Sequence, residues 1–218
     1  MTVVLKLGGR VAAGSVRQAL DFDEGVVVVH GAGPQITDEL ERRGLAATFV
    51  RGRRVTTPEV LEVVRASLAA VNAELCEALG ARAVGLMGGG IGLRARQVDE
   101  LGLVGEPEPS APEAITAALA AGRIPVVAPL AEGPLNVNAD EAAAALAVGI
   151  GAERIVFVSD VPGVIVDERV VRVLPADEAE AGLRAGSFEG GIVPKLTAAI
   201  HAARGGVRAS IGATEVPA

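Results

Sequence analysis

The segment VVLKLGG, residues 3–9, is a short apolar run that carries one lysine and ends in a pair of glycines. A second apolar run, VVVVHGAGP at 26–34, also ends in a glycine turn. Continuous β-branched runs of this length are typical of strands that are buried on both faces of a parallel sheet. The two segments therefore predict an α/β protein in which glycine turns follow the first two strands.

Strands and helices are expected to alternate along the rest of the chain. The expected strands are 83–87, 124–127, 155–158 and 207–211, and the expected helices are 34–43, 58–79, 111–121, 138–148, 175–184 and 194–203. This alternation predicts an α/β sandwich with a mainly parallel central sheet. Residues 88–105 alternate polar and apolar side chains, which favours a small β-ribbon on one edge. The Pro-rich segment 106–112 is expected to be a surface connector.

The composition argues against several classes of function. The 218 residues carry a net charge of -7 and include neither Trp nor Tyr. Nucleic acids and anionic membranes select basic surfaces, and single strands also need aromatic stacking, so we expect no such partner. The apolar stretches are too short to span a bilayer and there is no signal-peptide pattern, so we expect a cytoplasmic protein. The single cysteine excludes an intrachain disulfide.

Only two of the 20 basic residues are lysines, Lys6 in KLGG and Lys195 in GGIVPK at 190–195. Lysine offers a compact charge on a flexible stem, whereas arginine offers a planar fork. Lys6 could extend toward solvent, but inside a sheet it needs an anionic partner. Lys195 could be an exposed lysine, but with Pro194 as the first helical residue it would share an anion with free helical N–H groups. The pattern predicts a phosphate held by two lysines.

The segment NVNAD, 136–140, places Asn136, Asn138 and Asp140 on alternate residues, hence on one side of an extended loop. Helix capping is the alternative, since Asn and Asp favour that position. An Asp near two lysines can hold both ammonium groups, and Asn amides can bind a substrate by hydrogen bonds.

Two adjacent arginines, Arg53 and Arg54, precede the expected helix at 58–79. An Arg fork suits a substrate carboxylate, and the alternative is a solvated charge pair.

The chain offers no convincing general base. His30 ends a buried strand, and His201 lies in mid-helix among alanines. A carboxylate acceptor is already ionised at neutral pH and needs no proton removed. Transfer of a phosphoryl group to it depends on positioning and on nearby cations, which two lysines and a metal-bound nucleotide supply.

Six blocks in order along the chain resemble the amino acid kinase family, and within it the N-acetylglutamate kinases. They are KLGG (6–9), VVHGAGPQI (28–36), FVRGRRVT (49–56), NVNADEAA (136–143), FVSDVPGV (157–164) and GGIVPKL (190–196). The resemblance implies an open, three-layer αβα sandwich with two lobes. The N-terminal lobe, 1–135, would bind an acylated amino acid and dimerise. The C-terminal lobe, 136–218, would bind ATP, with Mg²⁺ held through the ATP phosphates and not by protein ligands.

The resemblance also implies roles for individual residues. The catalytic residues would be Lys6 and Lys195, which stabilise the transferring phosphoryl group, and Asp140, which orients both lysines. Substrate would be bound by Gly31, Ala32, Arg54, Asn136 and Asn138, with Arg54 on the α-carboxylate. The nucleotide would contact Lys6, Gly8, Gly9, Ser159, Asp160, Gly163 and Lys195.

Three departures from the family pattern lead to further expectations. Ala32 replaces the second glycine of the family turn, which narrows the space for the acyl group. The chain ends at Ala218, which suggests a shortened nucleotide lobe. It begins at the first strand, without the N-terminal helix of arginine-inhibited hexameric relatives, so we expect a homodimer without arginine feedback.

The leading hypothesis is ATP-dependent phosphorylation of the side-chain carboxylate of N-acetyl-L-glutamate to an acyl phosphate, in arginine biosynthesis. One alternative is the same step on an amino-blocked α-aminoadipate in lysine biosynthesis, since one methylene gives only about 1–3 kcal/mol of discrimination. Another is a non-catalytic sensor of acyl amino acids or nucleotides, because a fold alone does not establish activity.

Overall fold

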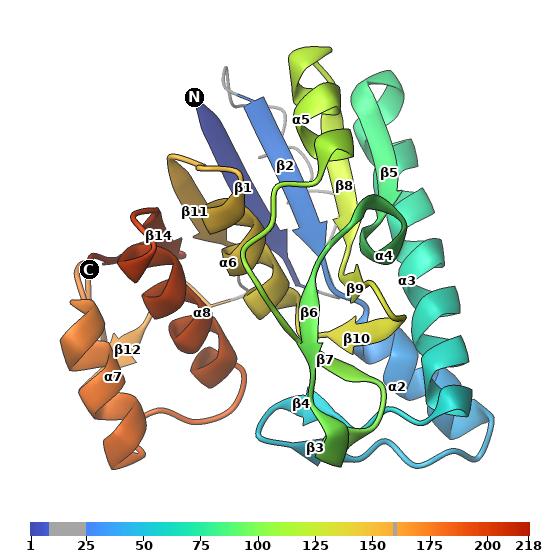
Figure 1. Ribbon diagram of the computed structural model, residues 1–218. Coiled ribbons are helices and arrows are strands. Elements are labelled where there is room, and N and C mark those ends of the chain that lie inside the picture. The colour runs from blue at the N-terminus through green and yellow to red at the C-terminus, as the bar shows by residue number, and fades with distance from the viewer. Residues whose placement is uncertain (9–24, 159–160) are drawn as a thin grey trace.

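The computed structural model describes residues 1–8, 25–158 and 161–218. A seven-stranded sheet runs through its centre (Figure 1), in the order β15-β14-β11-β1-β2-β8-β5. These strands are β1 (Thr2–Leu7), β2 (Gly25–His30), β5 (Ala83–Met87), β8 (Ile124–Ala128), β11 (Arg154–Phe157), β14 (Arg208–Ile211) and β15 (Thr214–Val216). Every neighbouring pair is parallel except β14 and β15. The predicted parallel sheet is thus confirmed.

Helices cover both faces of this sheet, which confirms the αβα sandwich. The helices are α2 (Gly33–Arg42), α3 (Pro58–Leu79), α4 (Gly88–Ile91), α5 (Glu113–Ala120), α6 (Ala139–Gly149), α7 (Ala176–Ala185) and α8 (Ile192–Arg204), with 3₁₀ turns η1 (Gly80–Arg82) and η2 (Asp99–Leu101). One apolar core joins the sheet to α5, α6, α7 and α8, and a second joins it to α2 and α3. In Figure 1, α6 lies in front of β1 and β2.

Alternation along the strands decides which face each side chain occupies. On β1, Val3 and Leu5 point into the α2–α3 core, whereas Val4 belongs to the α6–α8 core. Lys6, two residues after Val4, therefore shares the α6–α8 face. On β2 the residues Val26 and Val28 face α3, so His30 shares the α3 face.

The prediction for residues 88–105 is partly wrong. Residues Gly88–Ile91 form α4 and not a strand, because Gly88 and Gly89 pack closely against the 130–131 backbone, where a Cβ would lie 2.4 Å and 2.9 Å from carbonyl oxygens. Strands β6 (Ala95–Gln97) and β7 (Val104–Pro107) do pair antiparallel. They belong to a separate sheet, β6-β7-β10-β9, with β9 (Leu130–Ala131) and β10 (Leu135–Val137), and not to the edge of the main sheet.

Two other local predictions need correction. Helix α8 begins at Ile192, so Pro194 is its third residue and not its first. The first four N–H groups of a helix have no partner within it, which is why proline is tolerated there. The 106–112 connector is not wholly at the surface, because Ser110 is buried and its backbone lies against Gly149, where a Cβ would come within 2.2 Å of it.

Two short hairpins complete the described structure, β3 (Phe49–Val50) with β4 (Arg53–Arg54) and β12 (Ile165–Val166) with β13 (Arg169–Val170). The carboxyl ends of β1, β2 and β8 point toward the lower half of Figure 1, where β10 and the β3–β4 hairpin gather. In parallel sheets ligands bind beyond these strand ends, so this edge is where a site is expected. Within the described residues, no helix is both long enough and apolar enough to cross a bilayer.

Candidate active site at the carboxyl edge of the sheet

A cavity of about 280 Å³ opens at the carboxyl ends of β1 and β2. The predicted site residues that line it are Lys6, Gly8, Gly31, Ala32, Arg54, Asn136, Asn138, Asp140 and Lys195. They come from segments far apart in the sequence, and the fold brings them to one place. Gly163 is not among the lining residues. Gly9, Ser159 and Asp160 lie outside the described residues.

Asp140 lies between the two lysines, as the sequence predicts. The Lys6 ammonium is 2.8 Å from Oδ1 of Asp140, and the Lys195 ammonium is 3.7 Å from Oδ2. Lys6 and Asp140 are each only 5% exposed. Burial disfavours the charged form of Lys6 and lowers its pKa, as does the charge of Lys195, whereas Asp140 raises it. Among the described residues, the one carboxylate of Asp140 thus pairs with both ammonium groups.

The start of α6 positions this carboxylate. Asn138 is the N-cap of α6, and its side-chain oxygen accepts hydrogen bonds from the backbone N–H groups of Asp140 and Glu141 at 2.8 Å and 3.3 Å. The capping alternative is therefore correct for this oxygen of Asn138. Asp140 lies in the first turn, where the helix dipole favours a negative charge. Lys195 lies in the first turn of α8.

The glycine turn after β2 presents backbone donors to the cavity. The N–H of Gly31 is not one of them, because it donates to the Leu7 carbonyl at 3.2 Å and continues the sheet. The following residue, Ala32, is the N-cap of α2, and its φ of −141° is negative, so the turn does not need the left-handed region that favours glycine. At such a helix start the first N–H groups have no intrahelical partner. Of the two turn residues predicted to bind substrate, Ala32 is the one whose N–H donates to no backbone carbonyl among the described residues.

Arg54 has one half of its guanidinium fixed and the other half unpaired. Its Nη2 donates to the Gly33 carbonyl at 3.3 Å and to Oγ1 of Thr37 at 2.9 Å, and its Cζ lies 4.5 Å from the centre of the Phe49 ring. Nη1 is buried without a hydrogen-bond partner among the described residues. A buried donor left unpaired is costly, so Nη1 suits an acceptor that enters the cavity. Burial lowers the pKa of Arg54, which nonetheless stays charged.

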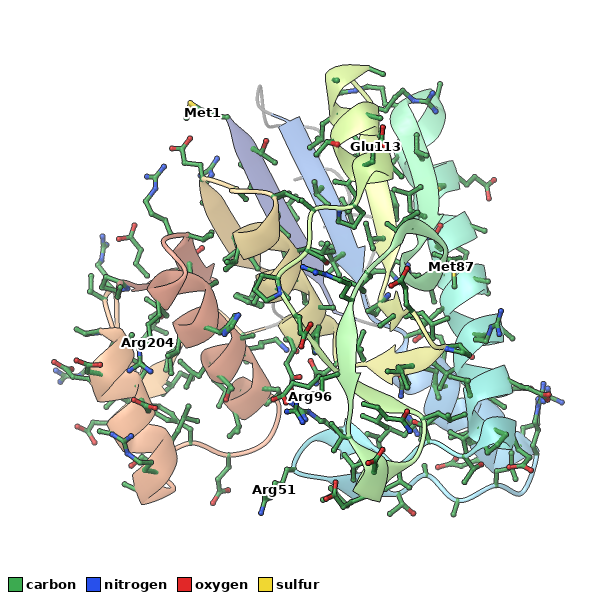
Figure 2. All side chains as sticks on the ribbon, viewed as in Figure 1. Met1, Arg51, Met87, Arg96, Glu113 and Arg204 are labelled. Carbon is green, nitrogen blue, oxygen red and sulfur yellow. The ribbon has the colours of Figure 1, made fainter. Side chains whose placement is uncertain are left out.

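Arg53 has other partners. Its Nε and Nη2 donate to the two carboxylate oxygens of Glu141 at 3.1 Å and 2.9 Å, and Nη2 also reaches Glu106 at 3.3 Å. Glu106 pairs in turn with Arg96, which is labelled in Figure 2. Burial raises the pKa of Glu141, and the hydrogen bonds from Arg53 oppose the rise. Neither arginine belongs to a solvated charge pair, and Arg54 is the one with an unpaired nitrogen.

Asn136 is held in the cavity by a residue that the sequence did not single out. The Asn136 Nδ2 donates to Oγ1 of Thr56 at 3.0 Å, and this hydroxyl donates to the Arg54 carbonyl at 2.8 Å. Thr56 is fully buried. The threonine therefore couples the β4 strand to β10, and no pattern in the sequence pairs residues 80 positions apart.

Only some of the residues that are predicted to bind the nucleotide lie in the described part of the chain. Gly163 is buried, and a Cβ there would lie 2.7 Å from Oγ1 of Thr214 and 2.8 Å from Cγ1 of Val170. Packing alone explains this glycine, and its contact with a nucleotide stays a prediction. Within residues 1–8, 25–158 and 161–218, no three His, Cys, Asp or Glu side chains gather as a metal site.

The fold and the cavity together define a class of protein. An αβα sandwich that presents two ammonium groups, a glycine turn and two helix N-termini at the carboxyl edge of its sheet is built to hold a phosphate-like anion. The unpaired Arg54 nitrogen adds a place for a carboxylate in the same cavity.

Comparison with known proteins identifies the family. The sequence profile of the amino acid kinase family matches residues 1–212, and the chain belongs to this family. It is similar to the acetylglutamate kinase of Rubrobacter xylanophilus, at 42% identity over 96% of this chain and 88% of that protein. It is also similar to the acetylglutamate kinase of Methanopyrus kandleri, at 41% identity over 95% of this chain and 93% of that protein.

Two solved structures share the fold. The smu.665 protein of Streptococcus mutans superposes with a TM-score of 0.88 at 24% identity, covering 99% of this chain and 98% of that one. The carbamate kinase of Giardia superposes with a TM-score of 0.73 at 16% identity, with the same coverage.

Proposed function

We propose that the protein transfers the terminal phosphoryl group of ATP to the side-chain carboxylate of N-acetyl-L-glutamate, giving an acyl phosphate for arginine biosynthesis. The observation that carries the proposal is the Lys6–Asp140–Lys195 cluster beside the unpaired Arg54 nitrogen in one cavity. The relatives named acetylglutamate kinase, similar over nearly their whole length, support the choice of acceptor over an aminoadipate derivative.

The acceptor would bind on the Arg54 side of the cavity. Nη1 of Arg54 would donate to the α-carboxylate, and Asn136 would bind the same substrate through its amide. Side chains that could pack against the aliphatic and acyl parts of the substrate line the cavity there: Ile36, Phe49, Leu68 and Val104. Ala32 limits the space at the glycine turn, which favours a small acyl group.

The phosphoryl group would lie between Lys6 and Lys195. Its charge grows on oxygens near both ammonium groups as the transition state forms, and cations fixed there stabilise it without reorganisation. Asp140 would hold the two lysines apart and in place. The acceptor carboxylate is ionised at neutral pH, so no side chain has to remove a proton.

ATP would bind as its Mg²⁺ complex, which neutralises phosphate charge and supplies the phosphoryl group. The residues present suit the phosphate end of this ligand, because a Cβ at Gly8 or Gly33 would meet nothing within 4 Å and leaves room near the strand ends. We assign residues 1–135 to the acceptor lobe and residues 136–218 to the nucleotide lobe. The active form would be a homodimer, which light scattering coupled to gel filtration can measure.

Trapping of the acyl phosphate by hydroxylamine tests this proposal. Purified protein with ATP and Mg²⁺ should give hydroxamate with N-acetyl-L-glutamate, less with N-acetyl-α-aminoadipate, and little with free glutamate. Preferred turnover of free glutamate would contradict the proposal. If no substrate is turned over, calorimetry that shows acyl amino acid binding without ATP–Mg²⁺ binding would identify a sensor.

A further inference from the structure

Asn72 is a polar residue on the apolar, buried face of α3, and it serves neither the cavity nor the helix end. It is 7% exposed and faces β2 and β8. Its Nδ2 donates to the Val126 carbonyl of β8 at 2.8 Å and lies 3.0 Å from Nε2 of His30, the last residue of β2. Buried amides are kept where their hydrogen bonds matter, so these two contacts indicate a role.

The contact with β8 fixes which way the Asn72 amide points. A carbonyl oxygen can only accept, so the group that faces Val126 must be the NH₂ and not the oxygen. The same NH₂ has a second hydrogen, which it donates to His30. Nε2 of His30 therefore accepts, and the ring proton of the neutral imidazole must be on Nδ1.

The surroundings of His30 keep the ring neutral. His30 is completely buried, and burial lowers its pKa to about 4, although the hydrogen bond to Gly31 opposes this. On the other side of the amide, Oδ1 of Asn72 lies 3.8 Å from Sγ of Cys76. A Cβ at Gly85 would lie 2.3 Å from this oxygen, so glycine in β5 is what lets α3 come so close.

Within the described residues, the acceptor for the Nδ1 proton is the Gly31 carbonyl, 3.4 Å away. This carbonyl and the N–H of Ala32 belong to the same planar trans peptide unit, so they point in opposite directions. When the carbonyl is held toward the buried imidazole, the N–H is held toward the other side. Gly31 and Ala32 both line the cavity, and the Ala32 N–H donates to no backbone carbonyl among the described residues.

We propose that Asn72 is a positioning residue: through His30 it sets the Gly31–Ala32 peptide so that the Ala32 N–H faces the transferred phosphoryl group. The inference rests on the proposed function for its effect on the rate. The hydrogen-bond chain from α3 to the peptide can be tested separately. An N–H fixed at the position where charge develops typically contributes about 10²–10³ in kcat, so a loosened peptide should lower kcat more than KM.

The tautomer of His30 tests the chain without any activity measurement. Nitrogen-15 NMR of the histidine-labelled protein should show a protonated Nδ1 and an unprotonated Nε2 for His30. Asn72→Asp replaces the donor by an acceptor, so Nε2 should become protonated and the signal of an unprotonated Nε2 should be lost. A protonated Nε2 in the unmodified protein, or an unchanged tautomer in the Asn72→Asp protein, would overturn the proposal.

Two substitutions of His30 separate positioning from packing. In His30→Asn the amide nitrogen can replace Nδ1 and donate to Gly31, but the contact with Asn72 is lost and a void is left. In His30→Gln the amide oxygen can replace Nε2 and accept from Asn72, but the donor to Gly31 is lost. Positioning therefore predicts the higher kcat for His30→Asn, by about tenfold, although its melting temperature should be the lower of the two.

KM for both substrates should change by less than about threefold in these variants, since the lost interaction belongs to the transition state. If kcat follows the melting temperature, so that His30→Gln is the more active, His30 acts through packing and the proposal is wrong. If the unmodified protein yields no acyl phosphate, the proposed function fails, and the NMR result still decides the hydrogen-bond chain.

Discussion

Replacing Asp140 by Asn removes the carboxylate that pairs with both Lys6 and Lys195 in the described part of the chain. At an effective dielectric constant near 20, unit charges at the observed 2.8 Å and 3.7 Å interact by about 6 and about 4.5 kcal/mol before desolvation is subtracted. Removing one partner of a buried ion pair typically lowers the free energy of unfolding by about 3–5 kcal/mol. Asn has nearly the shape of Asp, so the change acts mainly on charge.

Because Asp140 affects the pKa of Lys6, the effect of Asp140→Asn on activity should depend on pH. The pKa of Lys6 already lies below the usual value because of burial, and Asp140 is what raises it. Without that carboxylate the pKa of Lys6 falls further, because burial and the charge of Lys195 are then unopposed by Asp140. Only the ammonium form can stabilise the phosphoryl group, so activity should be lost as pH rises through the lowered pKa.

Quenched measurements of ADP release at saturating substrates, from pH 6 to pH 9, would detect this. We expect kcat of Asp140→Asn at pH 8 to fall at least about a hundredfold, which is the typical effect of losing one transition-state contact. The kcat should recover in part as the pH is lowered toward 6. Glu141→Gln is the matched control, because it removes the neighbouring carboxylate, which pairs with Arg53, and should keep the original pH profile. A kcat within about threefold of the original protein, with an unchanged pH profile, would refute this reasoning.

Three other substitutions test separate parts of the site and its support. Arg54→Lys should raise KM for N-acetylglutamate at least about tenfold and leave KM for ATP unchanged, because the Nη1 donor to the substrate carboxylate is lost. Arg53→Lys, at the arginine whose partner is Glu141, should change both KM values less. Gly85→Ala should lower the free energy of unfolding by about 1–3 kcal/mol in urea, since the new methyl group overlaps Asn72; an unchanged midpoint would contradict the close approach. Asn138→Ala should lower the free energy of unfolding in urea by about 1 kcal/mol, because the N-cap of α6 is lost. A decrease of less than about 0.3 kcal/mol would argue against capping.

Much of the fold could be predicted because its signals are local. The continuous runs at β1 and β2 predict buried parallel strands, and the helix α3 matches its predicted bounds because Pro58 and Gly80 mark its two ends. Strands β6 and β7 are only three and four residues long, and β7 pairs with β10, so tertiary pairing and not propensity decides their sheet.

The site was predictable where residue chemistry alone points to it. The scarcity of lysine singled out Lys6 and Lys195, and the need of a buried ammonium for an anion led to Asp140. To predict which N–H of the glycine turn can bind a ligand, the sheet register must be known. Only the pairing of β1 with β2 shows that the Gly31 N–H donates to the Leu7 carbonyl. The contact of Asn72 with His30 likewise depends on how α3 packs against β2, although a lone amide on an apolar helical face is a signal that could have been noticed.

The turnover number of Lys6→Arg and Lys195→Arg, measured as hydroxamate formed from N-acetylglutamate at saturating ATP–Mg²⁺, tests the phosphoryl clamp most directly. Arginine keeps the positive charge but cannot place it as a compact ammonium beside Asp140. We expect kcat to fall at least about a hundredfold in each variant, with the fold intact by circular dichroism. Turnover close to that of the original protein in both variants would show that the two lysines do not stabilise the transferred phosphoryl group.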